Sequence, residues 1–229
     1  MIEVHGITKK FGRKIVLEDV SFTAEKGEIT CLIGINGAGK TTIMNAIMSM
    51  TPVKGGPILV DGCEMDKSSY EKVTFIPDAI TMLPQMTIAD AMQFMSDFYK
   101  GWNEKRAAEL LTFFRLKQEE RISDLSKGNR AKANLLLGLA LDVDYLLMDE
   151  PFSGIDMFSR EQIAEVFTSH LVEGRGVLIT THEINDIEHL IDKVVMLDGG
   201  KVVKEFRTEE MREEEGKSVV DVMRGVYQK

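Results

Sequence analysis

The feature that most constrains this chain is the stretch at 34–41, which reads GINGAGKT and fits the pattern Gly-x-x-x-x-Gly-Lys-Thr. In this pattern the backbone N–H groups of a glycine-rich loop, together with one lysine, enclose the phosphates of a nucleotide. Residues 28–33 predict a buried strand that enters the loop, and residues 42–50 predict a helix that leaves it. The spacing and its context therefore predict a nucleotide-binding protein.

Each residue type in this loop suits a task at a phosphate. Glycines at 34, 37 and 39 let the backbone approach phosphate oxygens and take up positive φ, Lys40 supplies a cation, and the Thr41 hydroxyl is placed to ligate Mg²⁺. An ordinary glycine turn is the alternative, and the flanking strand and helix argue against it. The residues expected to contact the nucleotide are Asn36, Gly37, Gly39, Lys40, Thr41 and Thr42.

Two further groups of polar residues follow in the chain. The sequence LSKGN opens an apolar helix, and there Ser126 offers a hydroxyl and Gly128 a bare backbone amide, a combination suited to a phosphate. An ordinary helix cap by Ser126 would look the same. Further on, an apolar strand ends in Asp149 and Glu150, whose side chains point in opposite directions along a strand. Two carboxylates after a buried strand are hard to explain by packing alone.

The order of these pieces, continued by PFSGID at 151–156 and TTH at 180–182, resembles the ATP-binding cassette family, the nucleotide-binding subunits of ABC transporters. The resemblance covers residues 2–206. It implies an α/β fold of the P-loop NTPase type, with a mostly parallel sheet core, an antiparallel β layer and a helical subdomain. It also implies that two cassettes sandwich ATP head to tail, each site combining the phosphate loop of one subunit with the Leu-Ser-x-Gly motif of the other.

The resemblance carries roles to individual residues of this chain. Asp149 matches the aspartate that holds Mg²⁺, and Glu150 the glutamate that orients and polarises the attacking water. His182 matches the histidine that hydrogen-bonds the γ-phosphate, and Asp156 belongs to the loop that couples the two sites across the dimer interface. Phe11 matches the aromatic position that stacks on adenine, although a place in the core would also suit it. His5, His170 and His189 lack a comparable context and are assigned no role.

Two departures from the family pattern are informative. Where the family often carries a glutamine beside Mg²⁺ and the attacking water, this chain has Asp78, which can reach Mg²⁺ through a water but cannot donate a hydrogen bond. Lys127 and Asn129 replace the commoner glycine and glutamine of the signature, while its phosphate-contacting serine and glycine are retained. The acidic residue, the short helical insert and the absence of a carboxyl-terminal regulatory domain look like the branch that exports drugs, antibiotics or amphipathic antimicrobial peptides.

Composition bounds the remaining possibilities. The chain has 229 residues and a formal net charge of -9, so it suits one cassette and disfavours nucleic-acid binding. Its longest apolar stretches fall short of the ~20 residues that span a bilayer, and no signal peptide is recognisable, so we expect a separate integral membrane permease as partner. Cys31 and Cys63 have no metal-site spacing and indicate a reduced environment. The expected location is the cytoplasmic face of the cell membrane, with a second cassette, identical or a sister subunit, as further partner.

We expect one ABC ATPase domain over residues 1–229. Within it, 1–85 and 142–208 form the nucleotide-binding core with the antiparallel layer, 86–141 form the helical subdomain, and 209–229 form a helical tail whose acidic run is a solvated face. Further elements are predicted from hydrophobic alternation and turn residues. They are short strands up to residue 33 separated by Gly6, Gly12 and Lys26-Gly27, strands at 58–60, 177–181, 194–197 and 201–203, and helices beginning near Thr87 (with Asp90 as a capping box), 104, 159 and 183.

Apolar residues near the start of the helical insert are candidates to receive a helix of the membrane partner. They are residues 82–86 with Met92, Phe94 and Met95, and Trp102 on the same rim; a place in the core of the subdomain is the other interpretation. The alternative function is that of a soluble ABC ATPase with a translation or DNA-associated role. DNA-repair relatives need a long coiled coil between residues 40 and 126, and translation relatives carry two cassettes, so both fit this chain less well.

Overall fold

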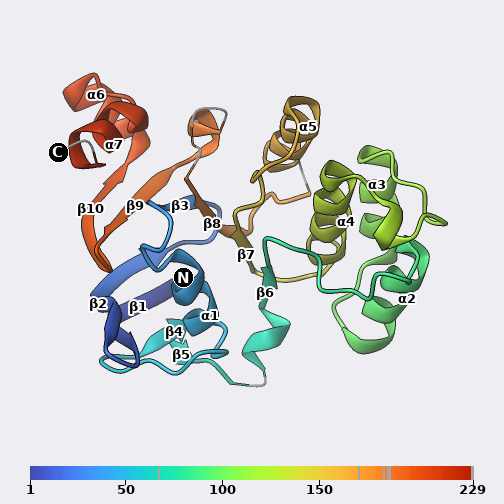
Figure 1. Cartoon of the computed structure of the whole chain (residues 1–229), viewed down its shortest axis with the longest axis horizontal. Coiled ribbons are helices and arrows are strands. Elements are labelled where there is room, and N and C mark those ends of the chain that lie inside the picture. The colour runs from blue at the N-terminus through green and yellow to red at the C-terminus, as the bar shows by residue number, and fades with distance from the viewer. Residues whose placement is uncertain (67, 170, 183, 185–186, 228–229) are drawn as a thin grey trace.

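The computed structural model describes residues 1–66, 68–169, 171–182, 184 and 187–227 (Figure 1). In this part of the chain the strands form two sheets. The larger sheet contains β3 (Ile29–Gly34), β6 (Val73–Ile76), β7 (Tyr145–Asp149), β8 (Gly176–Thr181), β9 (Lys193–Asp198) and β10 (Lys201–Arg207). The smaller sheet contains β1 (Ile2–Phe11), β2 (Lys14–Ala24), β4 (Ile58–Val60) and β5 (Cys63–Glu64).

The larger sheet has the strand order β10-β9-β3-β8-β7-β6 and is parallel from β9 to β6. Its inner strands are continuous apolar runs because both faces are covered. Only β10 runs antiparallel, joined to β9 by a turn whose Gly199 and Gly200 both have positive φ, as a two-residue hairpin requires. The mostly parallel core is therefore confirmed.

The smaller sheet is the predicted antiparallel layer, in the order β2-β1-β4-β5. Its first strands are longer than expected. Gly6 does not separate two strands; it lies inside β1 with φ +56°, where the register with β2 shifts between Val4 and Ile7. A bulge with glycine in the left-handed region lets one long strand bend without ending, which the sequence alone did not distinguish from a turn.

The described helices are α1 (Lys40–Ile47), α2 (Ile88–Phe98), α3 (Glu104–Phe113), α4 (Lys127–Leu139), α5 (Met157–Phe167), α6 (Thr208–Glu215) and α7 (Val219–Tyr227). Helix α1 begins two residues before the prediction, because Gly39 is its left-handed N-cap, and it ends before Ser49, whose φ is +53°. The start of the helix expected near Glu183 lies outside the described residues; a single turn at Glu188–Leu190 follows. None of the described helices is long and apolar enough to cross a membrane.

Two hydrophobic clusters cover the two faces of the larger sheet. One cluster joins Leu32, Leu147 and Leu178 to the smaller sheet and to the buried face of α1. The other joins alternate residues of the same strands, such as Cys31 and Met148, to α2–α5 and α7. This alternation follows from the period of two along a strand, and it puts α1 and α4 on opposite faces of the sheet.

Helices α2, α3 and α4 lie together at one side of the molecule, and α6 with α7 lies at the other (Figure 1). The capping box of α2 is confirmed: the Thr87 hydroxyl accepts from the Asp90 amide at 3.0 Å, and the Asp90 carboxylate accepts from the Thr87 amide at 2.9 Å. Met95 is buried, so for this residue the core interpretation holds. The exposed apolar side chains of this side are Leu83, Phe94, Phe98 and Tyr99. The division into subdomains stays a prediction.

Candidate active site

Most of the predicted site residues lie at or just after the carboxyl ends of four neighbouring parallel strands. In the order β3-β8-β7-β6, these ends lead to the glycine-rich loop, to His182, to Asp149 with Glu150, and to Asp78. The carboxyl edge of a parallel sheet is where such folds bind their ligands, because loops there are free to converge. The sheet order explains how residues distant in sequence reach one edge.

The glycine-rich loop is shaped by backbone conformations that only glycine adopts easily. Gly37 and Gly39 have φ +85° and +108°, and a side chain at Gly39 would also come within 2.6 Å of the Leu17 side chain. Lys40 is the first residue of α1 and is almost completely buried. Its ammonium donates to the Gly34 carbonyl at 2.7 Å, so the lysine spans the mouth of the loop.

Glu150 joins this lysine to the histidine. One carboxylate oxygen lies 3.1 Å from Lys40 Nζ and the other 2.8 Å from His182 Nδ1. Strand β7 ends at Asp149, and Glu150 adopts a left-handed φ of +48°, so a sharp turn directs its side chain rather than the strand alternation that the sequence suggested. The Glu150 amide donates to the Thr180 hydroxyl at 2.9 Å, which holds this turn.

The surroundings of Glu150 also affect two nearby groups, the Asp149 carboxylate and the Cys31 thiol. The Thr180 hydroxyl donates to the carboxylate of Asp149, which is only 4% exposed. Burial, reinforced by the charge of Glu150, raises the pKa of the Cys31 thiol far above its usual range. Cys31 therefore stays a protonated core residue and is no nucleophile.

A cavity of about 340 Å³ opens beside the loop. Its lining contains eight of the predicted residues: Phe11, Asn36, Gly37, Gly39, Lys40, Thr41, Thr42 and Glu150. Lys14 and Val16 also line it and were not predicted. Both lie on β2, which pairs with β1 next to Phe11, a neighbourhood set by strand register that no local motif reveals. Phe11 is 54% exposed, so it is no core residue, and Lys9 Nζ lies 4.8 Å from the centroid of its ring.

The metal-binding role of Thr41, Asp149 and Asp78 stays a prediction. Thr41 lines the cavity, and Asp149 ends the adjacent strand with a buried carboxylate. Among the described residues no three histidine, cysteine or acidic side chains converge on a metal site. Mg²⁺ does not require them, because it keeps several waters and takes substrate phosphate oxygens beside one or two protein ligands. Asp78 is exposed after β6 and is not part of the described cavity lining.

The predicted signature and coupling residues lie beside one another, outside this cavity. Ser126 caps α4 by accepting from the Asn129 amide at 3.2 Å, and Asp156 caps α5 by accepting from the Ser159 amide at 2.9 Å. That backbone hydrogen bond keeps the pKa of Asp156 below its usual value. Gly128 is buried where α4 meets α5, and a side chain there would overlap the Ser159 hydroxyl. The glycine is thus required by packing within one chain, whatever it contacts in a second.

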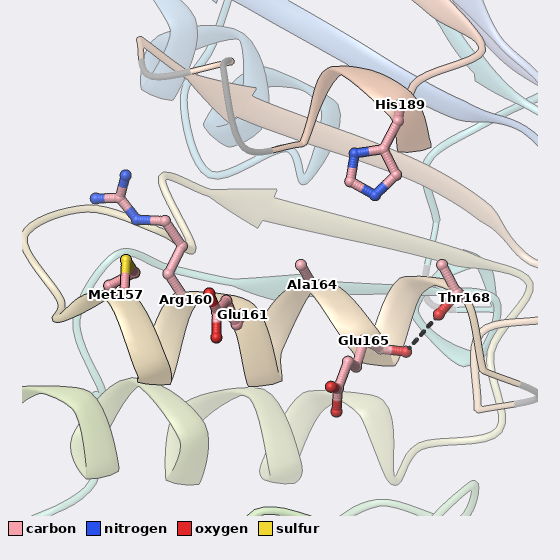
Figure 2. A pocket seen from close by; sticks show the side chains of 7 residues that line it. All are labelled: Met157, Arg160, Glu161, Ala164, Glu165, Thr168 and His189. Atoms are coloured by element: carbon pink, nitrogen blue, oxygen red, sulfur yellow. Dashed lines mark hydrogen bonds between the residues drawn. The ribbon is translucent and has the colours of Figure 1, made fainter.

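A larger hollow, of about 450 Å³, has no part in this chemistry (Figure 2). Figure 2 shows Met157, Arg160 and other side chains along one face of α5, with His189 opposite. None of the described lining residues belongs to the glycine-rich loop or ends a parallel strand. The larger volume of a hollow therefore does not identify it as the active site.

Two other histidines were assigned no role from the sequence. His5 is exposed and lies 3.3 Å from Glu3, and His170 lies outside the described residues.

A phosphate-binding loop, a buried lysine and a carboxylate pair on this sheet edge define a P-loop ATPase. The family model described as ABC transporter matches residues 17–153, more than half of the chain, and the chain belongs to that family. It is an ATP-binding ABC ATPase.

Curated relatives match nearly the whole chain. The linearmycin resistance ATP-binding protein LnrL of Bacillus subtilis (strain 168) is 31% identical, over 89% of this chain and 68% of its own. The petrobactin import ATP-binding protein YclP of the same organism is 32% identical, over 93% and 89%. The Nod factor export ATP-binding protein I of Rhizobium johnstonii is 32% identical, over 98% and 75%. Relatives of similar identity thus carry names of import, export and resistance.

Solved structures agree with the fold. The ATP-binding subunit of an ABC transporter matches with a TM-score of 0.86 and 26% identity, covering 97% of this chain and 98% of its own. A dimeric ATP-binding cassette in a post-hydrolysis state, bound to ADP and Pi, matches with a TM-score of 0.79 and 23% identity, covering 90% and 98%. At that identity the second likeness concerns the fold alone.

Proposed function

We propose that this chain hydrolyses ATP within a dimer of cassettes and thereby drives a separate membrane permease that exports drugs, antibiotics or amphipathic peptides. The observation that carries the proposal is the contact series from Lys40 to Glu150 to His182 at the mouth of the phosphate loop. A buried lysine, a carboxylate and an imidazole within hydrogen-bond reach supply a phosphate anchor, a base and a group that orients the base. The chain sits at the cytoplasmic face of the membrane, bound to the permease.

ATP would change the partner of Lys40. The Lys40 ammonium lies 3.1 Å from a carboxylate oxygen of Glu150. The γ-phosphate is the stronger partner for a buried ammonium, so it takes Lys40 and leaves the carboxylate to its other partner, His182. Glu150 then accepts a proton from the water that attacks the γ-phosphorus as the bond to the bridging oxygen of ADP breaks. Mg²⁺, when held by Thr41 and Asp149, offsets the negative charge of the phosphates.

The second cassette supplies the remaining phosphate contacts. Ser126 and Gly128 stand at the amino end of α4, where backbone amides and the helix dipole attract an anion, yet they do not line their own chain's cavity. A head-to-tail partner, identical or a sister subunit, would bring its α4 to this cavity and receive this chain's α4 in return. Asp156, adjacent to Gly128, then couples the two sites.

The direction of transport and the class of cargo rest on weaker support. The names of the linearmycin resistance and Nod factor export relatives favour export. The petrobactin import relative has similar identity, so the ATPase site by itself does not determine direction. Asp78, acidic where the family often has glutamine, is the feature of this chain that favours the exporter branch.

Replacing Glu150 with glutamine tests the proposed chemistry. The amide keeps the shape of the side chain but is no base, so we expect ATP binding to persist while hydrolysis falls on the order of 100-fold or more. In light scattering with MgATP the variant should double its mass, because a closed dimer accumulates when ATP is not consumed. Glu119→Gln, an exposed substitution, should behave as the wild type. Normal turnover by Glu150→Gln would remove Glu150 from the role of base.

A further inference from the structure

The C-terminal tail (residues 208–227, comprising α6 and α7) contacts the base of the phosphate loop. The Tyr227 hydroxyl, near the end of α7, lies 2.9 Å from the Leu197 carbonyl and 3.2 Å from the Ile33 carbonyl. Ile33 immediately precedes Gly34, where β3 turns into the loop. One tyrosine from the far end of the chain thus hydrogen-bonds the backbone at the point where the nucleotide-binding loop begins.

The chain is tightly packed at Gly34, where β3 turns into the loop. A side chain at Gly34 would come within 2.9 Å of the Leu197 carbonyl, so the space between β3 and β9 has no room for one here. The Gly34 carbonyl also accepts from Lys40 at 2.7 Å. Burial, with the nearby charge of Asp198, raises the pKa of Tyr227 to about 12, so its hydroxyl remains a donor at neutral pH.

The tail has a second attachment, at Glu188. The Glu188 carboxylate, in the turn that follows His182 in the chain, accepts from the Val219 amide at 2.9 Å and lies 3.4 Å from Arg212 Nη2. The start of the tail is fixed independently, because the Thr208 amide donates to the Asp192 carbonyl at 3.0 Å. The tail therefore joins the base of the phosphate loop to the segment that continues from the catalytic histidine.

We propose that the C-terminal tail is a positioning element of the nucleotide site and that the Tyr227 hydroxyl is a positioning residue for the phosphate loop. By donating its one hydrogen to the Leu197 carbonyl, and in part to the Ile33 carbonyl, it keeps Gly34 and the loop amides in the arrangement that receives phosphates. The inference rests on the proposed phosphate-binding role of the loop. It assigns the tail a part in ATP binding rather than in folding alone.

Tyr227→Phe removes the hydroxyl and keeps the ring. With purified full-length chain, calorimetric titration with ADP should show affinity reduced on the order of 3- to 10-fold, the effect of about one lost hydrogen bond. KM for ATP should rise more than kcat falls. Amide hydrogen exchange without nucleotide should become faster at residues 34–41. Tyr70→Phe, which removes another tyrosine hydroxyl that donates to a backbone carbonyl, that of Met48 at 2.9 Å, is the matched control and should leave all three readouts as in the wild type.

Two results would overturn the inference. One is an ADP affinity of Tyr227→Phe within about twofold of the wild type, and the other is faster exchange confined to residues 208–227, which indicates a purely structural contact. Lys40→Ala separates this inference from the proposed function. If Lys40→Ala binds ADP as tightly as the wild type, the proposed phosphate site is wrong; if it loses binding while Tyr227→Phe does not, only the role of the tail is wrong.

Discussion

Glu150 adopts a backbone conformation that glutamate rarely takes, with φ +48°. Such a residue costs on the order of 1 kcal/mol or more of folding free energy, and it persists here because its amide is held by Thr180. The turn sets one carboxylate oxygen against Lys40 and the other against His182. Strain at this position is thus coupled to the geometry on which hydrolysis depends. The identity of the residue was evident from the sequence, but its conformation was not.

Asp61 provides a pH-dependent test at the same scale. Burial opposes its charge, but the Tyr145 hydroxyl donates to it at 2.5 Å, and the net effect lowers its pKa from 3.8 to about 2. A depressed folded-state pKa stabilises the fold above the unfolded value, and that stabilisation is lost as the pH falls through the folded value. We expect urea denaturation to find Asp61→Asn less stable than the wild type at pH 7, with the difference shrinking from about pH 3.8 to about pH 2.

Asparagine tolerates the left-handed φ of +50° at this position, so the substitution tests charge and not backbone strain. Tyr145→Phe, which removes one of the donors, should reduce the pH dependence without abolishing it, because the Met1 ammonium still donates to Asp61 at 2.9 Å. A difference between wild type and Asp61→Asn that is as large at pH 2 as at pH 7 would contradict this account.

Among the elements, α4 connects the signature residues at its start to the segment that contains Asp78. It begins at the Ser126 cap, and near its other end Gly138 lies so close to the Ile76 side chain that a Cβ would overlap it. Between them Asn134 donates to the Pro77 carbonyl at 2.6 Å. A displacement of the signature by a second cassette would therefore reach the segment that contains Asp78 through one rigid helix.

Alanine substitutions at two helical glycines test this packing. Gly138→Ala should reduce the free energy of unfolding by about 1–3 kcal/mol, because the added methyl meets Ile76 in a filled core. Gly225→Ala, in α7, meets no heavy atom within 4 Å and should instead stabilise the chain by up to about 1 kcal/mol, since alanine favours the helix. Chemical denaturation measures both. Equal effects of the two substitutions would mean that α4 does not pack on β6 as described.

Elements with local signals were predictable, and contacts between distant segments were not. The Thr87 cap of α2 is encoded within four residues, so the sequence alone predicted it. The placement of Lys14 in the cavity depends on strand pairing, and the meeting of Gly128 with Ser159 depends on how two helices pack. Tyr227 lies in no recognisable motif, and only the folded chain brings it to the phosphate loop. The motif residues, which determine the chemistry of the site, can be recognised in the sequence. The contacts that support them become visible only in the tertiary structure.

At the scale of the whole molecule, the active site and the group of exposed apolar side chains near α2 serve different functions. That surface consists of Leu83, Phe94, Phe98 and Tyr99, and the rings of Phe94 and Phe98 lie 4.6 Å apart. Exposed aromatic and apolar side chains in a group are typical of protein interaction sites. We infer that they receive the permease; the sequence had already suggested Leu83 and Phe94 for this role, but not Phe98 and Tyr99.

The most direct test of the account is to tag the chain, purify it from detergent-solubilised membranes of its native host, and identify its companions by mass spectrometry. We expect a multi-spanning membrane protein in about equal amount, also with the exposed control Val203→Ser, but much less of it with Phe94→Ser and Phe98→Ser combined. Recovery of ribosomal or DNA-bound proteins, with the chain absent from the membranes, would contradict a role in transport and leave a soluble ABC ATPase.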